Sequence, residues 1–229
     1  MACAFLTGAT VSAAAALAAE GVHPDFNGLW RCARNCGNGE LIPWQTLEIT
    51  EEGRARYEYN SAGVQRGDPT IDTVLACRPV GIPRLAMFGT FEIFQRDDAI
   101  GIIGEWSGPP RVIRFAEHHR DNFYPTFMGD PIAHWEGDTL VVETVNIDEQ
   151  TFLDSSGFPH SDQLRFVERW TLSDDGNSIL SDWTIEDPKI FNLPFTKQVE
   201  YVRKDESDET QRVAEYVCQN LEEGGRIVN

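Results

Sequence analysis

Short segments in which apolar and polar residues alternate recur along most of the 229-residue chain, and strong turn signals separate them. Alternation with a period of two places one face of a β-strand in a core and the other in water. The turns include Asp97-Asp98, Gly108-Pro109-Pro110 and Asp174-Asp175-Gly176-Asn177. The pattern predicts strands over 25–30, 44–49, 90–95, 100–106, 111–115, 139–146, 164–172, 178–186, 196–203 and 212–218.

Many short strands at regular spacing predict an all-β fold, either a barrel or a sandwich. We favour an antiparallel, lipocalin-like β-barrel of about 8–10 strands with one short helix. The helix is predicted over 51–60, with Thr50 as its N-cap and acidic residues in its first turn. No linker or repeat divides residues 20–229, so we expect one domain there.

Residues 1–19 carry no charged side chain and end in small residues. An apolar segment followed by Ala16-Leu17-Ala18 is typical of a signal peptide with an A-x-A cleavage site, although no basic residue precedes Phe5. The run is short for a membrane anchor. We therefore expect residues 1–19 to be a signal peptide and the protein to be periplasmic or secreted.

Cysteine usage agrees with export, because Cys32, Cys36, Cys77 and Cys218 remain after the predicted leader. In an oxidising compartment four cysteines allow two bridges in three connectivities. We prefer Cys32 with Cys36 and Cys77 with Cys218. The C-x3-C spacing is not that of a zinc site, and the histidines show no H-x-H or H-E-x-x-H spacing, so no metal is predicted.

The charge balance restricts the partners. The chain has 37 acidic and 19 basic residues and a formal charge of -18. Such a surface repels phosphate backbones and anionic lipid, which disfavours nucleic acid and membrane insertion and favours solubility. A small molecule is the expected ligand, because a small barrel can hold one in its lumen.

Glu168 is the sharpest local signal. In the predicted strand 164–172 it shares a face with Phe166, Trp170 and Leu172. A carboxylate on an apolar face is costly to bury unless it has a partner or a task. Glu168 is therefore the leading catalytic candidate, and the alternative is a solvent-facing or rim residue paired with an arginine.

Two polar loops supply further catalytic candidates. His160 lies close to Asp162, and a histidine beside a carboxylate is the usual proton shuttle near neutral pH. His119 and Tyr124 form a similar group, and all four would converge over Glu168 if both loops open at one end of the barrel. Alternatively, His160 is exposed and Asp162 only caps a turn. The candidates for substrate binding are Arg111, Arg165, Glu143, Glu105 and Trp170.

Several motifs recur in combination between about residues 70 and 220. They are Cys77-x-Pro79-x-Gly81-x-Pro83-Arg84, Pro125-Thr126-Phe127-x-Gly129, HWEGDTLVVET over 134–144, Asp154-x-x-Gly157-x-Pro159-His160-Ser161, Glu168-Arg169, Glu186-Asp187-Pro188 and Pro194-Phe195-Thr196. The combination resembles a family of exported bacterial proteins that largely lack an assigned activity. The resemblance implies an exported bacterial protein and a probable fold, not a reaction.

These features suggest a secreted enzyme that performs cofactor-free acid–base chemistry, as a lyase, isomerase or dehydratase, on a small, partly apolar or aromatic molecule. Glu168 or His160 would abstract a proton, Asp162 would orient His160, and Tyr124 would act as an acid. Arg111 or Arg165 would hold an anionic group. The alternatives are a non-catalytic small-ligand carrier and a structural module of the cell envelope.

Overall fold

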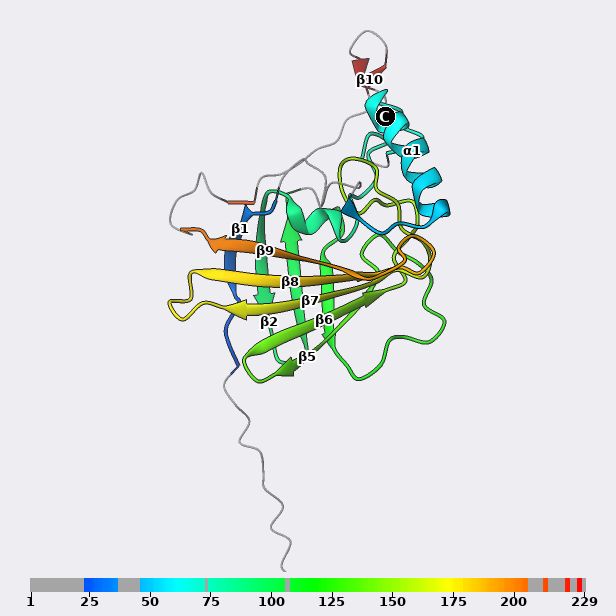
Figure 1. Ribbon diagram of the computed structural model, residues 1–229. Helices are drawn as coiled ribbons and strands as arrows, with labels where there is room; N and C mark the ends of the chain where they lie inside the picture. The colour runs from blue at the N-terminus through cyan, green and yellow to red at the C-terminus, as the bar shows by residue number, and fades with distance from the viewer. Residues whose placement is uncertain are drawn as a thin grey trace, which may run out of the picture.

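The computed structural model describes residues 23–36, 46–72, 74–105, 108–205, 212–213, 221–222 and 226–227. Strands β1 to β9 pair in chain order, and β1 also pairs with β9, so that the sheet closes into a barrel (Figure 1). β10 (Leu221–Glu222) and β11 (Arg226–Ile227) form a separate small sheet. The barrel strands are β1 (Gly28–Arg34), β2 (Thr90–Gln95), β3 (Ala99–Gly104), β4 (Arg111–Phe115), β5 (Asp130–Glu136), β6 (Thr139–Val145), β7 (Arg165–Leu172), β8 (Ser178–Glu186) and β9 (Phe195–Arg203).

The predicted all-β barrel with one short helix is confirmed, but it is mixed and not wholly antiparallel. β4 and β5 run parallel and share only the pairs Arg114↔Ile132 and Phe115↔Ala133. The alternation pattern predicts no strand over 130–136, so β5 is not among the predicted strands. Pro131 lacks an N–H and is disfavoured inside strands, which hides the alternation there.

The other predicted elements agree to different degrees. Predicted strands 90–95, 111–115 and 178–186 have the bounds of β2, β4 and β8, and the others in the barrel differ at their ends. Of predicted strand 44–49, only 46–49 is described, and Ile49 there makes a single bridge to Phe191. Residues 1–19 and 214–218 lie outside the described part of the chain.

Helix α1 (Glu51–Gln65) begins where predicted and ends later than the predicted Asn60. The Thr50 hydroxyl accepts a hydrogen bond from the Gly53 N–H at 2.9 Å, as expected for an N-cap. Gly63 lies inside the helix, and a Cβ there would come within 2.6 Å of the Ile71 side chain. Gly63 therefore packs closely against Ile71. Its low helix propensity alone would have placed it in a turn.

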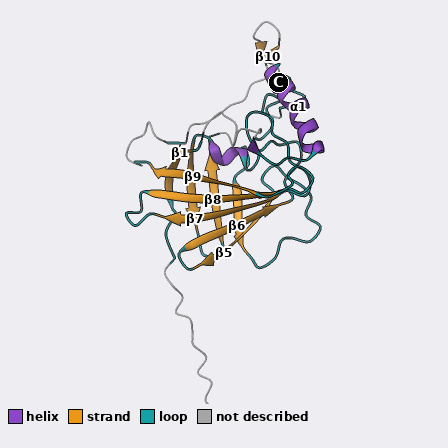
Figure 2. Ribbon diagram, viewed as in Figure 1, coloured by secondary structure: helices purple, strands orange, loops and turns teal. Residues whose placement is uncertain are grey.

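The two ends of the barrel differ in their connections. Short turns join β2 to β3, β5 to β6 and β7 to β8 at one end. The long connections β1–β2, β6–β7 and β8–β9 meet at the opposite end, which we call the loop end. α1 and the short 3-10 helix η2 (Arg84–Met87) also lie there (Figure 2).

Aromatic side chains fill the loop end. Phe158 packs on Tyr57 of α1, with ring centroids 4.9 Å apart, and on Phe191 at 5.5 Å. Phe191 also contacts Phe195 at the start of β9, at 4.9 Å. The connections thus form a core continuous with the barrel core, which includes Trp30, Phe166 and Trp183. The described aromatic residues of these connections are consequently packed against one another.

Cys32 and Cys36 form a disulfide, as the sequence analysis prefers. Cys77 is also disulfide-bonded, and its preferred partner, Cys218, lies outside the described residues. Within the described part of the chain, no helix combines the length and apolarity needed to cross a membrane.

Candidate functional site

Arg111 and Glu168 form an ion pair inside the barrel. Glu168 is fully buried in the middle of β7, and Arg111 is 2% exposed at the start of β4. Because β5 and β6 separate these strands, the two side chains reach each other across the lumen. Arg111 Nη2 donates to Glu168 Oε2 and also to the Thr144 hydroxyl of β6, at 3.0 Å.

The structure therefore places Glu168 on the buried face that the alternation predicts. Its partner, Arg111, was proposed to hold an anionic substrate group. In the structure the charge of Arg111 is already balanced by Glu168. The pair is neutral overall, so the lumen has no unbalanced positive charge from Arg111 to attract an anion.

A cavity lies beside this pair at the loop end and offers about 40 Å³ to the centres of water-sized molecules. A cavity needs about 10–15 Å³ on this measure to hold one water, so the space suits roughly three. Glu168, Arg111 and Trp170 line one side. The other walls are mainly apolar and include Ile82, Leu85, Ala86, Phe88, Phe91 and Ile102.

Three buried polar atoms of residues that line this cavity have no hydrogen-bond partner among the described residues: Glu168 Oε1, Arg111 Nε and Trp170 Nε1. Buried polar groups in native proteins are nearly always satisfied by protein or by ordered water. Each of the three atoms is itself almost wholly covered by protein, with less than 1 Å² exposed, although their residues line the cavity.

Tyr201 joins the cavity to η2. Its hydroxyl donates to the Ala86 carbonyl at 3.0 Å, and its ring lines the cavity. Burial, reinforced by the negative charge of Glu168, raises the pKa of the Tyr201 phenol well above its ordinary value of 10.0. Tyr201 therefore stays protonated at neutral pH. Tyr201 is not among the predicted site residues, although its alternation with Val199 in β9 indicates an inward face.

The segment around η2 forms one lip of the cavity. Arg84 is held by a buried, two-bond ion pair with Asp72, at 2.9 and 3.1 Å. Leu85 and Phe88 are half-buried, as are Ile102 and Gly104 on the β3 side. The mouth of the cavity therefore lies between η2 and the end of β3.

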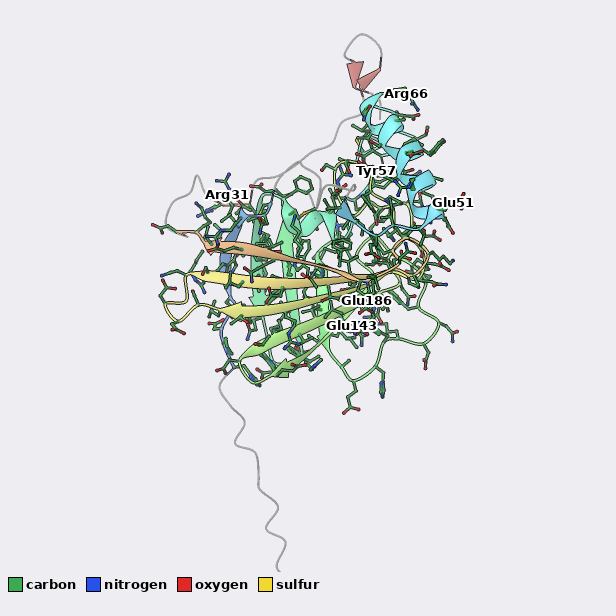
Figure 3. All side chains as sticks on the ribbon, viewed as in Figure 1. Arg31, Glu51, Tyr57, Arg66, Glu143 and Glu186 are labelled. Atoms are coloured by element: carbon green, nitrogen blue, oxygen red, sulfur yellow. A yellow bond between two sulfur atoms is a disulfide. The ribbon has the colours of Figure 1, made fainter. Side chains whose placement is uncertain are left out.

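Three of the predicted site residues meet elsewhere, on the outer face of the barrel. His119 lies between two carboxylates, with Nδ1 3.3 Å from Asp130 Oδ2 and Nε2 3.0 Å from Glu143 Oε1. Arg165 donates to Glu143 Oε2 at 2.9 Å and to Glu186 Oε2 at 3.0 Å. Figure 3 shows Glu143 and Glu186 close together near the loop end of β6 and β8.

This network lies next to the short parallel seam between β4 and β5. Burial works to raise the pKa of Asp130, but hydrogen bonds from the Arg120 N–H and from Arg114 outweigh it and hold that pKa below its ordinary value. The pKa of Glu143 is likewise lowered, because bonds from Arg165 and His119 outweigh burial. Holding β4 and β5 together is therefore a sufficient role for Asp130, Glu143 and their partners.

His160 is buried in the loop-end core and does not line the lumen cavity. Its Nδ1 lies 3.1 Å from the Ser161 carbonyl, and its Nε2 lies 2.7 Å from the Thr151 hydroxyl. Since a carbonyl only accepts, Nδ1 carries the proton. The single Thr151 hydroxyl proton faces two acceptors, His160 Nε2 at 2.7 Å and the Asp148 carbonyl at 3.0 Å. Burial lowers the pKa of His160 below 6.5, so the ring is neutral at pH 7.

The remaining candidates also lie outside the cavity. Asp162 is exposed and bonds Lys189 at 2.6 Å, not His160. Tyr124 is 73% exposed and stacks on Phe123. Glu105 accepts from the Thr90 N–H at 3.1 Å. The proposed convergence of the four residues over Glu168 is thus not present: His119, His160 and Asp162 bond other loop and strand groups, and Tyr124 is exposed.

The fold and the site define a closed, mixed β-barrel with a buried ion pair beside a small lumen cavity. No protein-family model matches the chain, and no curated protein matches it. Among the described residues, no group of three or more histidine, cysteine, aspartate or glutamate side chains is arranged to hold a metal ion.

The ion pair generates a stability prediction. We expect Glu168→Leu alone to lower the free energy of unfolding by about 3–5 kcal/mol, because Arg111 becomes an unpaired buried charge. Adding Arg111→Met should restore most of that loss, since apolar replacement of a buried pair is often neutral or better. Urea denaturation at pH 7 measures both. Equal destabilisation of the single and double variants would contradict this account.

The seam network generates a pH prediction. Because folding lowers the pKa of Asp130 below 3.8, ionised Asp130 stabilises the fold above that pH. This contribution is lost as the pH falls through the folded-state pKa. We expect Asp130→Asn to reduce the fall in the free energy of unfolding between about pH 5 and pH 2. Exposed Asp138→Asn is the control and should behave as wild type. Identical pH profiles for all three proteins would refute the prediction.

Proposed function

We propose that the protein is exported and binds a small, partly apolar molecule in the barrel lumen beside Arg111 and Glu168. The observation that carries the proposal is a mainly apolar cavity that Arg111, Glu168 and Trp170 also line. Ligand sites commonly combine apolar walls with a few polar groups that orient the ligand. Arg111, Glu168 and Trp170 are such a set.

The free-energy cost of burying the Arg111–Glu168 ion pair supports a ligand-binding role. Moving two charges out of water costs several kcal/mol per ion, and an apolar replacement is often at least as stable. The Arg111–Glu168 pair also leaves Glu168 Oε1 unsatisfied. A purely structural barrel gains little from that arrangement, whereas a ligand-binding barrel gains a specific anchor.

The size of the cavity limits how a ligand binds. A space of about 40 Å³ is smaller than the roughly 150 Å³ of a protein cavity that holds benzene. The polar end of a ligand therefore fits beside Glu168, while its apolar part extends into the mouth between Phe88 and Gly104 or displaces the η2 lip. A large rigid ligand is disfavoured.

Export rests on the uncharged residues 1–19 and on the disulfide of Cys32 and Cys36. Disulfides persist mainly in oxidising compartments such as the periplasm or the cell exterior. The resemblance to exported bacterial proteins supports the same location.

Filling the cavity tests ligand binding. Gly104 lines the cavity, and a Cβ there would meet nothing closer than Phe91 Cβ at 3.6 Å, so Gly104→Leu should fold and block the mouth. We expect wild type to bind at least one of phenol, anisole and indole in an NMR titration. Gly104→Leu should weaken that binding about tenfold or more, which is at least 1.4 kcal/mol.

The matched control is Gly101→Leu, on the same strand but the opposite face, where a Cβ has no neighbour closer than 4.0 Å. It should bind the probes as wild type does. Wild-type affinity in Gly104→Leu, or no binding of any probe to wild type, would refute binding in this cavity.

A second candidate function is cofactor-free acid–base catalysis in the same cavity, as a lyase, isomerase or dehydratase. It is favoured by the carboxylate of Glu168 and the protonated phenol of Tyr201, two residues that line the same cavity. His160, Asp162, His119 and Tyr124 have no part in this version, because they lie outside the cavity.

Hydrogen exchange at carbon tests this candidate. In D2O, we expect wild type to accelerate deuterium incorporation into the methyl group of acetophenone, with Glu168 removing the proton and the resulting enolate taking up a deuteron. The double variant Glu168→Leu/Arg111→Met should not do so. If acetophenone binds to wild type without faster exchange, the carrier function stands and the catalytic one falls.

A further inference from the structure

The lumen cavity is too small, as it stands, for a benzene-sized molecule. Its space of about 40 Å³ compares with roughly 150 Å³ for a protein cavity that holds benzene. Binding of a molecule of that size therefore requires one wall of the cavity to move.

The walls of the cavity differ in how they are held. Those from β2, β3, β4, β7 and β9 belong to the closed barrel, in which each strand pairs with a neighbour on both sides. The remaining wall consists of Ile82, Leu85, Ala86 and Phe88. These residues lie between β1 and β2 in the chain and outside the barrel sheet. The η2 lip, which we define as residues 82–88, is therefore the wall most easily displaced.

Both ends of the η2 lip are anchored to neighbouring backbone. The Ile82 N–H donates to the Phe127 carbonyl at 3.0 Å, and the Cys32 N–H of β1 donates to the Gly89 carbonyl at 3.5 Å. The flanking glycines, Gly81 and Gly89, have φ angles of +78° and +60°. Glycine populates such angles without steric cost, and hinges are typically a few loop positions that absorb changes in φ and ψ. Two positions suited to act as hinges thus bound the lip.

Between these ends, two side chains of β9 tie the lip to the barrel. The Tyr201 hydroxyl donates to the Ala86 carbonyl at 3.0 Å, and Lys197 Nζ lies 3.7 Å from the Met87 sulfur. A thioether is a weak acceptor, so the Tyr201 bond is the stronger tether. Because burial raises the pKa of Tyr201 well above its ordinary value, the phenol keeps its donor proton at neutral pH.

We infer that the η2 lip is a hinged gate over the lumen cavity and that the hydrogen bond from Tyr201 to Ala86 is the latch that holds it closed. The ion pair of Arg84 with Asp72 ties the first residue of η2 to the preceding loop and not to the barrel, so it does not oppose the opening of residues 85–88. The inference rests on the proposed lumen binding for the purpose of the gate, and it adds how access to that site is controlled.

Native-state hydrogen exchange of the full-length protein, followed by NMR, measures the opening without any ligand. The Leu85, Ala86 and Phe88 amides report on the lip, because each donates to a carbonyl within residues 81–88. In wild type, we expect them to exchange at least about tenfold faster than protected amides in the middle of β6 and β7, because the gate opens without unfolding the barrel.

Tyr201→Phe removes the latch hydroxyl and keeps the ring. It should speed exchange of the lip amides by a further factor of about two to ten, the range for the loss of one hydrogen bond. Tyr124→Phe is the matched control, because it makes the same substitution at a side chain that is 73% exposed and does not line the cavity. Its lip amides should exchange at the wild-type rate.

Probe binding measures the effect of the latch on access. The probe is whichever of phenol, anisole and indole binds wild type most tightly, and NMR line shapes give its association rate constant. We expect association to be several-fold faster with Tyr201→Phe than with wild type, because a required conformational change slows binding.

The outcomes separate the gate from the function on which it rests. The gate is overturned if the lip amides exchange no faster than those of β6 and β7, or if Tyr201→Phe leaves their exchange unchanged. Equal association rates for both proteins would overturn control of access by Tyr201, while lumen binding would stand. If none of the three probes binds to wild type, the lumen-binding function fails, whereas hydrogen exchange still decides whether the lip opens.

Discussion

The ion pair between Arg111 and Glu168 is the interaction on which the rest of the site depends. It connects β4 to β7 across the lumen, although β5 and β6 separate those strands in the sheet. Charges removed from water need further partners to offset the loss of solvation. Thr144 supplies one, but Oε1 of Glu168 has no hydrogen-bond partner among the described residues. The same pair that spans the barrel thus also lines its cavity.

At the loop end, polar residues of the types found in catalytic sites have structural roles. His160 satisfies Thr151 and the Ser161 carbonyl, and the Ser161 hydroxyl donates to buried Asp187 at 2.7 Å. Buried loops must pair their backbone and side-chain polar groups internally, because water cannot do so. Histidine, serine and aspartate in such a loop therefore resemble a catalytic group in sequence, while their hydrogen bonds hold the end of the barrel closed.

A second polar network serves the weakest seam of the sheet. Only two residue pairs join β4 to β5, and Asp130 and Glu143 with their arginine and histidine partners lie beside that seam. This seam network and the Arg111–Glu168 pair lie on opposite faces of the sheet. In β6, Thr144 points into the lumen and bonds Arg111, and Glu143 points out and bonds Arg165. The alternation of a strand separates a structural cluster from a candidate binding site by a single residue.

The amino-acid sequence by itself determined the local features: the strands at 90–95, 111–115 and 178–186, the Thr50 cap, and the inward face of Glu168. These depend on a period of two or on one turn of helix, and such patterns are complete within a few residues. Only the tertiary structure decided that Arg111 faces Glu168, that β5 runs parallel to β4, and that His160 is buried away from the lumen. Each of these results from contacts between residues far apart in the chain, for which a single sequence carries no local pattern.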